Sequence, residues 1–360
     1  YRLAKEMPKE ITSEAVEHDF IFVGLQGMID PARPEVKEAL QKAKEAGIRT
    51  VMITGDYPQT ARAIAEQIGL LQPGHQVKTG ADLEEMDDET LEREIAFTDV
   101  FARVSPEHKV RIVQALRSRG QVVAMTGDGV NDAPALKQAD IGVAMGITGT
   151  DVAKETADMV LTDDNYSSIV SAVEQGRIIY SNIRKFVYYL ISCNLAEIAV
   201  IFLAILLGQD SPLSPIQLLW LNLITDGAPA LALGTEKGDP DIMEHDPRPP
   251  EEPIINARMR TGIIVQTVAI TAVTLAAYFI GLNLFDKDGG HTAASTMAFF
   301  TLSFSELLRA FTARSERYPI LKIGLFTNRN MNLGVIFSAV MVLAVIYLPF
   351  LNPIFDTHPL

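Results

Sequence analysis

Residues 122–136 read Val-Val-Ala-Met-Thr-Gly-Asp-Gly-Val-Asn-Asp-Ala-Pro-Ala-Leu, so an apolar run gives way abruptly to a polar turn. The apolar run predicts a buried strand over residues 121–125. The turn carries three oxygen-bearing side chains within five residues, Asp128, Asn131 and Asp132, and the glycines beside Asp128 allow a close backbone approach. An isolated Thr-Gly-Asp is ordinary turn chemistry, whereas this longer string is much more specific. Such a turn is suited to a phosphoryl oxygen and a Mg²⁺ ion.

A second turn repeats the same tripeptide at Thr54, Gly55 and Asp56, directly after the apolar run 49–53. Lys109 opens a predicted helix, where its ammonium group can neutralise a transferring phosphoryl group. Polar groups just past the carboxyl ends of parallel strands are where α/β sheets bind ligands. We therefore expect both turns and Lys109 to share one site.

Short apolar runs alternate with helical patterns throughout the first 180 residues, which predicts a parallel α/β sheet. We expect its strands at residues 20–28, 49–53, 100–104, 121–125, 141–144 and 159–161. We expect the main helices between them at residues 34–46, 59–69 and 106–117.

Composition and charge divide the 360-residue chain into two parts, because 48% of it is hydrophobic while 21% is charged. Residues 1–180 hold 30 acidic and 19 basic residues, a net charge of −11, and the whole chain carries −14. An acidic domain repels a phosphate backbone, so we expect no nucleic-acid partner. The single cysteine, Cys193, lies in an apolar run, which excludes an internal disulfide and a cysteine metal cluster.

The second half contains apolar stretches of the length that crosses a bilayer, about 20 residues. We expect five such helices, at residues 183–208, 214–233, 259–282, 293–312 and 331–351. The connecting segments 234–260 and 309–330 are rich in Lys and Arg, whereas the alternate connections hold one basic residue at most. This asymmetry predicts that the soluble half lies in the cytoplasm.

Polar side chains inside these stretches fall on shared helix faces. Such side chains are energetically costly in a membrane and usually have a function. They are Asn194 and Glu197 at spacing i,i+3, then Asn222, Thr225 and Asp226 at i,i+3,i+4, and Glu306. Gly227 and Pro229 follow at once and are expected to loosen that helix. A set of oxygen donors without His or Cys suits a hard cation such as calcium, although Asn and Thr also join membrane helices by hydrogen bonds.

Together, residues 30–33 (Asp-Pro-Ala-Arg), the turn at Thr54, Lys109 and residues 126–136 resemble the P-type cation-transporting ATPases. The resemblance covers nearly the whole chain. It implies a haloacid-dehalogenase-like, Rossmann-like α/β domain followed by an all-α transmembrane bundle. It also implies that residues 1–20 are the tail of a nucleotide-binding domain, 21–180 are part of the phosphorylation domain, and 181–360 cross the membrane.

The resemblance assigns roles to the polar turns. Asp128 would bind Mg²⁺ with Asp132 as a weaker ligand, and Asn131 would order the site. Thr54, Gly55 and Lys109 would contact the phosphoryl group that ATP supplies, and Asp56 would orient its loop.

The ion-site residues match calcium pumps of the sarcoplasmic-reticulum type one by one, namely Asn194, Glu197, Asn222, Thr225, Asp226 and Glu306. The similarity implies transport of calcium across a lipid bilayer, with a bacterial cell membrane favoured by the compact loops and no obligate protein partner evident. A related sodium, proton or manganese pump is the alternative, and a non-catalytic membrane protein derived from a pump is another.

The family's phosphorylated Asp-Lys-Thr-Gly-Thr string does not occur in this sequence. We therefore expect the chain to be the C-terminal portion of a larger pump and not to hydrolyse ATP by itself. The first apolar stretch is expected to be continuous with a helix over Arg177–Phe186, which would connect the catalytic domain to the ion site.

Overall fold

The computed structural model describes residues 12–17, 20–26, 31–286 and 291–360, which divide into two units at Pro34. In the first unit the described residues form a short helix, α1 (Ser13–Val16), and an irregular segment over 20–26. Apolar side chains of that segment are 65–94% exposed. The strand predicted at 20–28 is therefore wrong for residues 20–26, because the described part of this unit offers no strand to pair with it. Residues 27 and 28, and Asp30 of the predicted motif, lie outside the described residues.

The α/β region of the second unit contains two parallel three-stranded sheets instead of the single sheet that we expected. One has the order β1-β3-β2, formed by β1 (Met52–Thr54), β2 (Gln76–Thr79) and β3 (Thr98–Ala102). The other has the order β4-β5-β6, formed by β4 (Ala124–Gly127), β5 (Ile141–Met145) and β6 (Met159–Leu161). β1 pairs with β3, and β4 pairs with β5, so β1 and β4 are edge strands of their sheets. The two sheets are separate because β1 and β4 do not pair with each other. Side chains still join them, since Ile53 packs against the apolar clusters of both.

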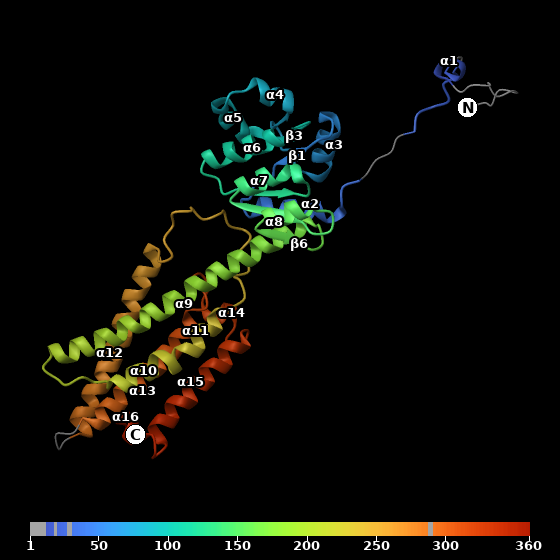
Figure 1. The fold of residues 1–360 in the computed structure, drawn as a ribbon. Helices are drawn as coiled ribbons and strands as arrows, with labels where there is room; N and C mark the ends of the chain where they lie inside the picture. Colours follow the sequence, from blue (N-terminus) through green and yellow to red (C-terminus); the bar gives the residue numbers. More distant parts are fainter. Residues whose placement is uncertain (1–11, 18–19, 27–30, 287–290) are drawn as a thin grey trace. The chain divides into compact units, whose positions relative to one another are not determined.

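Helices follow the strands as the alternating pattern predicts (Figure 1). They are α2 (Pro34–Glu45), α3 (Pro58–Ile68), α4 (Gly80–Glu85), α5 (Asp88–Glu94), α6 (Pro106–Ser118), α7 (Ala133–Gln138) and α8 (Asp151–Thr156), with 3₁₀ turns η1 (Ile95–Phe97) and η2 (Val130–Asp132). The start of α6 is fixed by a capping box, in which Ser105 and His108 exchange backbone-to-side-chain hydrogen bonds of 3.1 and 3.4 Å. This cap places Lys109 in the first turn of α6.

One helix, α9 (Tyr166–Leu206), runs without interruption from the α/β region into the apolar half (Figure 1). Its 41 residues span about 60 Å at 1.5 Å per residue. The continuous helix expected through Arg177 is thus confirmed. Arg177 anchors the N-terminal part of α9, because its guanidinium group donates to the backbone oxygens of Ala46, Ile242 and His245 at 2.7–3.0 Å.

The apolar half contains α10 (Pro215–Trp220), η3 (Leu221–Thr225), α11 (Gly227–Leu233), α12 (Ala257–Leu284), α13 (Thr292–Thr312), α14 (Ile320–Ile323), α15 (Arg329–Tyr347) and α16 (Asn352–Phe355). Within the described residues, four helical segments are long and apolar enough to cross a membrane: α9, 215–233, α12 and α15. The fifth expected span, α13, is a helix that packs on α12 and α15 but carries buried Glu306 and Arg309 and falls outside that group. Five spans therefore remain a prediction.

A buried ion pair closes one end of these helices, and we call it the Arg314 clasp. Arg314 and Glu236 are 1% and 5% exposed, and the guanidinium group meets both carboxylate oxygens at 2.8 and 2.9 Å. The remaining donors of Arg314 reach the backbone oxygens of Gly324 and Leu325 and the hydroxyl of Thr327. The clasp therefore joins the end of α11 to the segment between α13 and α15.

Candidate functional site

The second membrane segment is not a regular helix where the predicted ion ligands lie. A π-helical turn, η3, separates α10 from α11, and the amide of Asp226 donates to the carbonyl of Leu221, five residues back, at 2.9 Å. Pro229 favours this departure because it lacks the amide hydrogen that would bond four residues earlier. Turns of this kind occur often at functional sites. The loosening predicted from Pro229 is thus present, and Asn222 and Thr225 lie on the π turn itself.

Two carboxylates of the predicted site are held by neighbouring side chains. The hydroxyl of Tyr189 on α9 donates to Asp226 Oδ1 at 2.7 Å, and Asp226 is fully buried. The amide nitrogen of Asn222 donates to both oxygens of Glu197 at 2.9 and 3.2 Å. Helix α9 and the π turn therefore contact each other through the residues that the sequence singled out. Asn194 lies half-buried on the same part of α9.

Four oxygen atoms at this position are buried without a hydrogen-bond partner. They are Thr225 Oγ1, Asp226 Oδ2, and both Glu306 carboxylate oxygens. Glu306 is 0% exposed, and it stays unpartnered although Arg309 lies one turn away on α13. Arg309 instead places its guanidinium carbon 4.3 Å from the ring centre of Tyr188. Oxygens in this state are costly in an apolar interior unless a cation or proton joins them.

The donors also converge in space. One oxygen of Asp226, one of Glu306 and the sulfur of Cys193 all lie within 4.8 Å of one another. Three helical segments, α9, the end of η3 and α13, thus supply ligand atoms to one buried centre. Of the residues predicted to bind calcium, Asp226 and Glu306 meet at this centre, and Cys193 joins them unexpectedly.

A second site lies at the end of β4, where the sequence string 126–136 forms a tight loop. Asp132 accepts the ammonium of Lys109 on Oδ1 at 2.5 Å and the amides of Asp128 and Gly129 on Oδ2 at 3.2 and 3.1 Å. Burial tends to raise the pKa of Asp132, but Lys109 and the two amides outweigh it and lower that pKa. A side chain on Gly127 would lie 2.8 Å from Asp132 Cγ, so only glycine fits there.

A neighbouring loop supports Asp128 from the other side. The amide of Thr150 donates to the Asp128 carbonyl at 2.8 Å. Asp164 gathers this loop by accepting the amides of residues 146–148 at 2.6–3.0 Å and the hydroxyl of Thr148 at 2.8 Å. Desolvation tends to raise the pKa of Asp164, and these hydrogen bonds lower it to about 2. Asp164 is therefore the residue that orders the loop beside Asp128.

The donor set at β4 fits a magnesium ion, which prefers carboxylate and amide oxygens. The side chains of Asp128 and Asn131 are exposed at the loop, whereas both oxygens of Asp132 are already engaged. The other predicted turn lies at the end of β1 in the first sheet, where the Asp56 amide donates to Thr54 Oγ1 at 3.1 Å. Lys109 is thus placed beside Asp132, and Thr54 and Asp56 remain on the neighbouring sheet.

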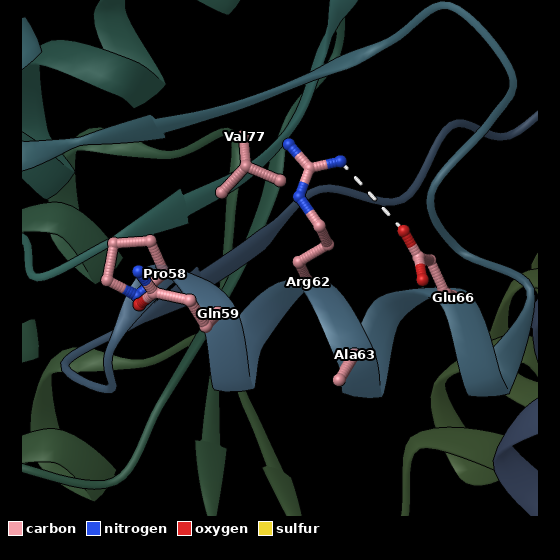
Figure 2. A pocket seen from close by; sticks show the side chains of 6 residues that line it. All are labelled: Pro58, Gln59, Arg62, Ala63, Glu66 and Val77. Atoms are coloured by element: carbon pink, nitrogen blue, oxygen red, sulfur yellow. Dashed lines mark ion pairs between the residues drawn. The ribbon is translucent and has the colours of Figure 1, made fainter.

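A shallow hollow of about 280 Å³ lies elsewhere, between α3 and β2. Figure 2 shows its lining, where Arg62 and Glu66 form an exposed ion pair at 3.9 Å. None of the predicted site residues lines this hollow.

Comparison with known proteins agrees with both halves of this description. Residues 210–360 match the family "Cation transporting ATPase, C-terminus", and residues 3–140 match the haloacid dehalogenase-like hydrolases. The chain is 50% identical to Calcium-transporting ATPase 1 of Bacillus cereus over 96% of its length. It is 47% identical to a calcium-transporting ATPase of Bacillus subtilis over 96%, and 41% identical to one of Yarrowia lipolytica over 99%.

Each half of the chain is thus similar to the corresponding part of the cation-transporting ATPases. The chain covers 40%, 38% and 38% of those three relatives, respectively. Its α/β domain has the haloacid-dehalogenase-like fold, as the resemblance implied, and its apolar helices make it a multi-pass membrane protein. The buried oxygen centre and the loop after β4 are therefore the two candidate functional sites of this chain.

Three residues near the buried centre were not predicted from the sequence, namely Tyr189, Cys193 and Arg309. Tyr189, Cys193 and Glu197 are spaced i,i+4,i+8, so a search for one helix face would have joined them. Arg309 carried no such signal, because it contacts a tyrosine ring on another helix and otherwise donates to Thr312 on its own helix.

Proposed function

We propose that this chain supplies the cation-binding helices and the magnesium and phosphate loop of a calcium-transporting ATPase. The observation that carries the proposal is the group of buried oxygens without partners on Thr225, Asp226 and Glu306. The names of the relatives support the same ion, since those at 50% and 47% identity are called calcium-transporting ATPases.

The chemistry of the centre favours a hard divalent cation. Two buried carboxylates beside each other repel, and each loses several kcal/mol of hydration on entering an apolar interior. A calcium ion offsets both effects, because it takes six to eight oxygen ligands at 2.3–2.6 Å. Glu197, Asn222 and Asn194 extend the donor set along α9 and η3. Calcium is the transported substrate in this proposal.

The loop after β4 supports the phosphoryl-transfer half of the function. Mg²⁺, held by Asp128 with Asn131 ordering the loop, would neutralise phosphoryl charge when bound. Lys109 stabilises the fold of this loop through Asp132, and its ammonium would offset the charge of a phosphoryl group bound at the same edge. Thr54, Gly55 and Asp56 would receive that group from the neighbouring strand. ATP is the phosphoryl donor in this account.

Helix α9 connects the two halves in one rigid element. It carries Arg177, which is bonded to the α/β domain at Ala46, and it carries Tyr189 and Glu197 at the buried centre. A movement of the α/β domain therefore reaches the cation ligands without crossing a flexible joint. We place the α/β domain in the cytoplasm, following the basic loops, and the helices in a bacterial cell membrane, following the Bacillus relatives.

Equilibrium binding of radioactive calcium to the purified protein in detergent tests the proposal. Glu306→Gln removes a charge but keeps the shape, and it should weaken calcium binding at least about tenfold, the effect of losing a charged contact of 1.5–3 kcal/mol. Ser305→Ala is the matched control, because its hydroxyl only bonds Thr301 O on the same helix. Equal calcium affinity in Glu306→Gln and the control would contradict the proposal. Binding of sodium or manganese in place of calcium would instead support the related pumps.

A further inference from the structure

The buried centre contains a thiol as well as carboxylates. Cys193 is 0% exposed on α9, and its sulfur lies within 4.8 Å of an oxygen of Asp226 and an oxygen of Glu306. Asp226 and Glu306 are both 0% exposed, and one oxygen of Asp226 and both of Glu306 lack a hydrogen-bond partner. The thiol is therefore adjacent to two buried carboxylates, and both oxygens of one of them, Glu306, lack a hydrogen-bond partner.

The distances suit a single small cation. A zinc-like ion binds sulfur at about 2.3 Å and oxygen at about 2.0–2.2 Å, so tetrahedral ligands stand about 3.6 Å apart. The three ligand atoms lie at most 4.8 Å apart, which small side-chain rotations can close. A calcium ion has longer bonds and needs more ligands, so it would use the oxygens and leave the sulfur aside.

The two kinds of ligand atom, sulfur and oxygen, distinguish soft cations from hard cations. Thiolate sulfur is a soft ligand that selects zinc-group cations, whereas carboxylate oxygen accepts hard and borderline cations alike. We propose that Cys193, Asp226 and Glu306 form a binding site for soft divalent cations, cadmium or zinc, which overlaps the calcium site. The inference builds on the proposed calcium function, since both sites use Asp226 and Glu306.

Binding forms a sulfur–metal bond as the thiol hydrogen leaves, so one proton is released for each ion bound through Cys193. The incoming dication balances the thiolate and one carboxylate, so one negative charge remains on the three ligands. Cadmium or zinc would therefore compete with calcium for Asp226 and Glu306 and would bind with higher affinity. A pump of this composition would be blocked by soft cations or would carry them.

A structural role is the simpler account of this thiol. Cys193 packs with Tyr189, Ala232 and Ala310 in an apolar cluster, as small buried side chains often do. In that account the sulfur would not discriminate between ions, and replacing it would alter stability alone. The two accounts differ in the ratio of cadmium to calcium affinity.

The experiment measures cadmium and calcium binding on the same purified protein in detergent, with ultraviolet absorption reporting sulfur-to-cadmium charge transfer. Cys193→Ser keeps a small polar side chain without the thiol. Ser192→Ala is the matched control, because Ser192 is buried next to Cys193 but its hydroxyl bonds Tyr189 O. Circular dichroism confirms that each variant is folded.

We expect Cys193→Ser to abolish the charge-transfer band and to lower cadmium affinity at least tenfold more than calcium affinity, with the ratio unaltered in Ser192→Ala. A band and an affinity ratio that survive in Cys193→Ser would overturn the inference, as would cadmium binding that excess calcium does not displace. A wild-type protein that binds cadmium through Cys193 but binds no calcium would refute the proposed function and leave the soft-cation site standing.

Discussion

Replacing Arg314 with methionine should destabilise the membrane half strongly. The guanidinium group makes five hydrogen bonds, two of them to Glu236, and both residues are buried. Methionine keeps the volume and leaves the Glu236 carboxylate with Asn328 as its remaining side-chain donor, at 2.9 Å. Removing one partner of a buried ion pair costs about 3–5 kcal/mol, because the other charge stays in a low-dielectric site.

That free energy translates into a measurable melting shift. At about 2.1 cal/mol/K per residue, unfolding the chain changes the entropy by about 0.76 kcal/mol/K. A loss of 3–5 kcal/mol therefore lowers Tm by about 4–7 °C. Thermal unfolding of the purified protein in detergent, followed by circular dichroism, measures this shift.

Two further variants show whether the effect arises from the ion pair. Arg317→Met removes a half-exposed arginine whose contact with Asp241 is 3.6 Å, and it should cost less than about 1 kcal/mol. The double variant Arg314→Met/Glu236→Met removes both charges and should lose less stability than the two single variants added together. A Tm for Arg314→Met within about 1 °C of the wild type, or additive losses in the double variant, would show that the clasp is not a stabilising ion pair.

The remaining predictions concern the two sites. Tyr189→Phe removes the donor to Asp226 and should destabilise the calcium-free protein by about 1–3 kcal/mol, with part of that loss recovered on adding calcium; equal melting of both proteins without calcium would contradict it. Gly127→Ala would place a methyl group against Asp132 and should cost about 1–3 kcal/mol by overpacking, and an unchanged Tm would show that the loop is looser than described. Asp164 has a lowered pKa, so its contribution is complete above its unfolded pKa near 3.9 and is lost as pH falls to about 2. The protection factors of the amides at 146–148 against hydrogen exchange should therefore fall across that interval in the wild type. An Asp164→Asn variant should already show low protection factors at neutral pH.

The sequence was most informative where local chemistry determines structure. The alternation of apolar runs and helical patterns placed β1, β3, β4, β5 and β6 within a few residues, since each strand is apolar and is followed by a turn. The continuity of α9 from Arg177 into the apolar half followed from the absence of a helix breaker, whereas its start at Tyr166 was not predicted. The grouping of Asn222, Thr225 and Asp226 followed from their spacing, and Pro229 indicated the disturbed helix.

Pairing and long-range contacts were less accessible. The division into two sheets depends on which edge strands pair. The apolar patterns of β1 and β4 do not show whether these two strands pair with each other. The strand predicted at residues 20–28 had the right composition, but the described part of its unit contains no second strand. Cys193 was dismissed as an apolar residue, because its closeness to Glu306 arises from the packing of α9 on α13.

The central claim is that one buried oxygen centre controls phosphoryl transfer at the loop after β4. The most direct test uses a pump that contains this chain and measures acid-stable phosphoenzyme formed from radiolabelled ATP while calcium is titrated. The account predicts that label appears only with calcium, and that Glu306→Gln needs at least about tenfold more calcium for half-maximal label than Ser305→Ala does. Label that forms without calcium, or at the same calcium concentration in both variants, would contradict it.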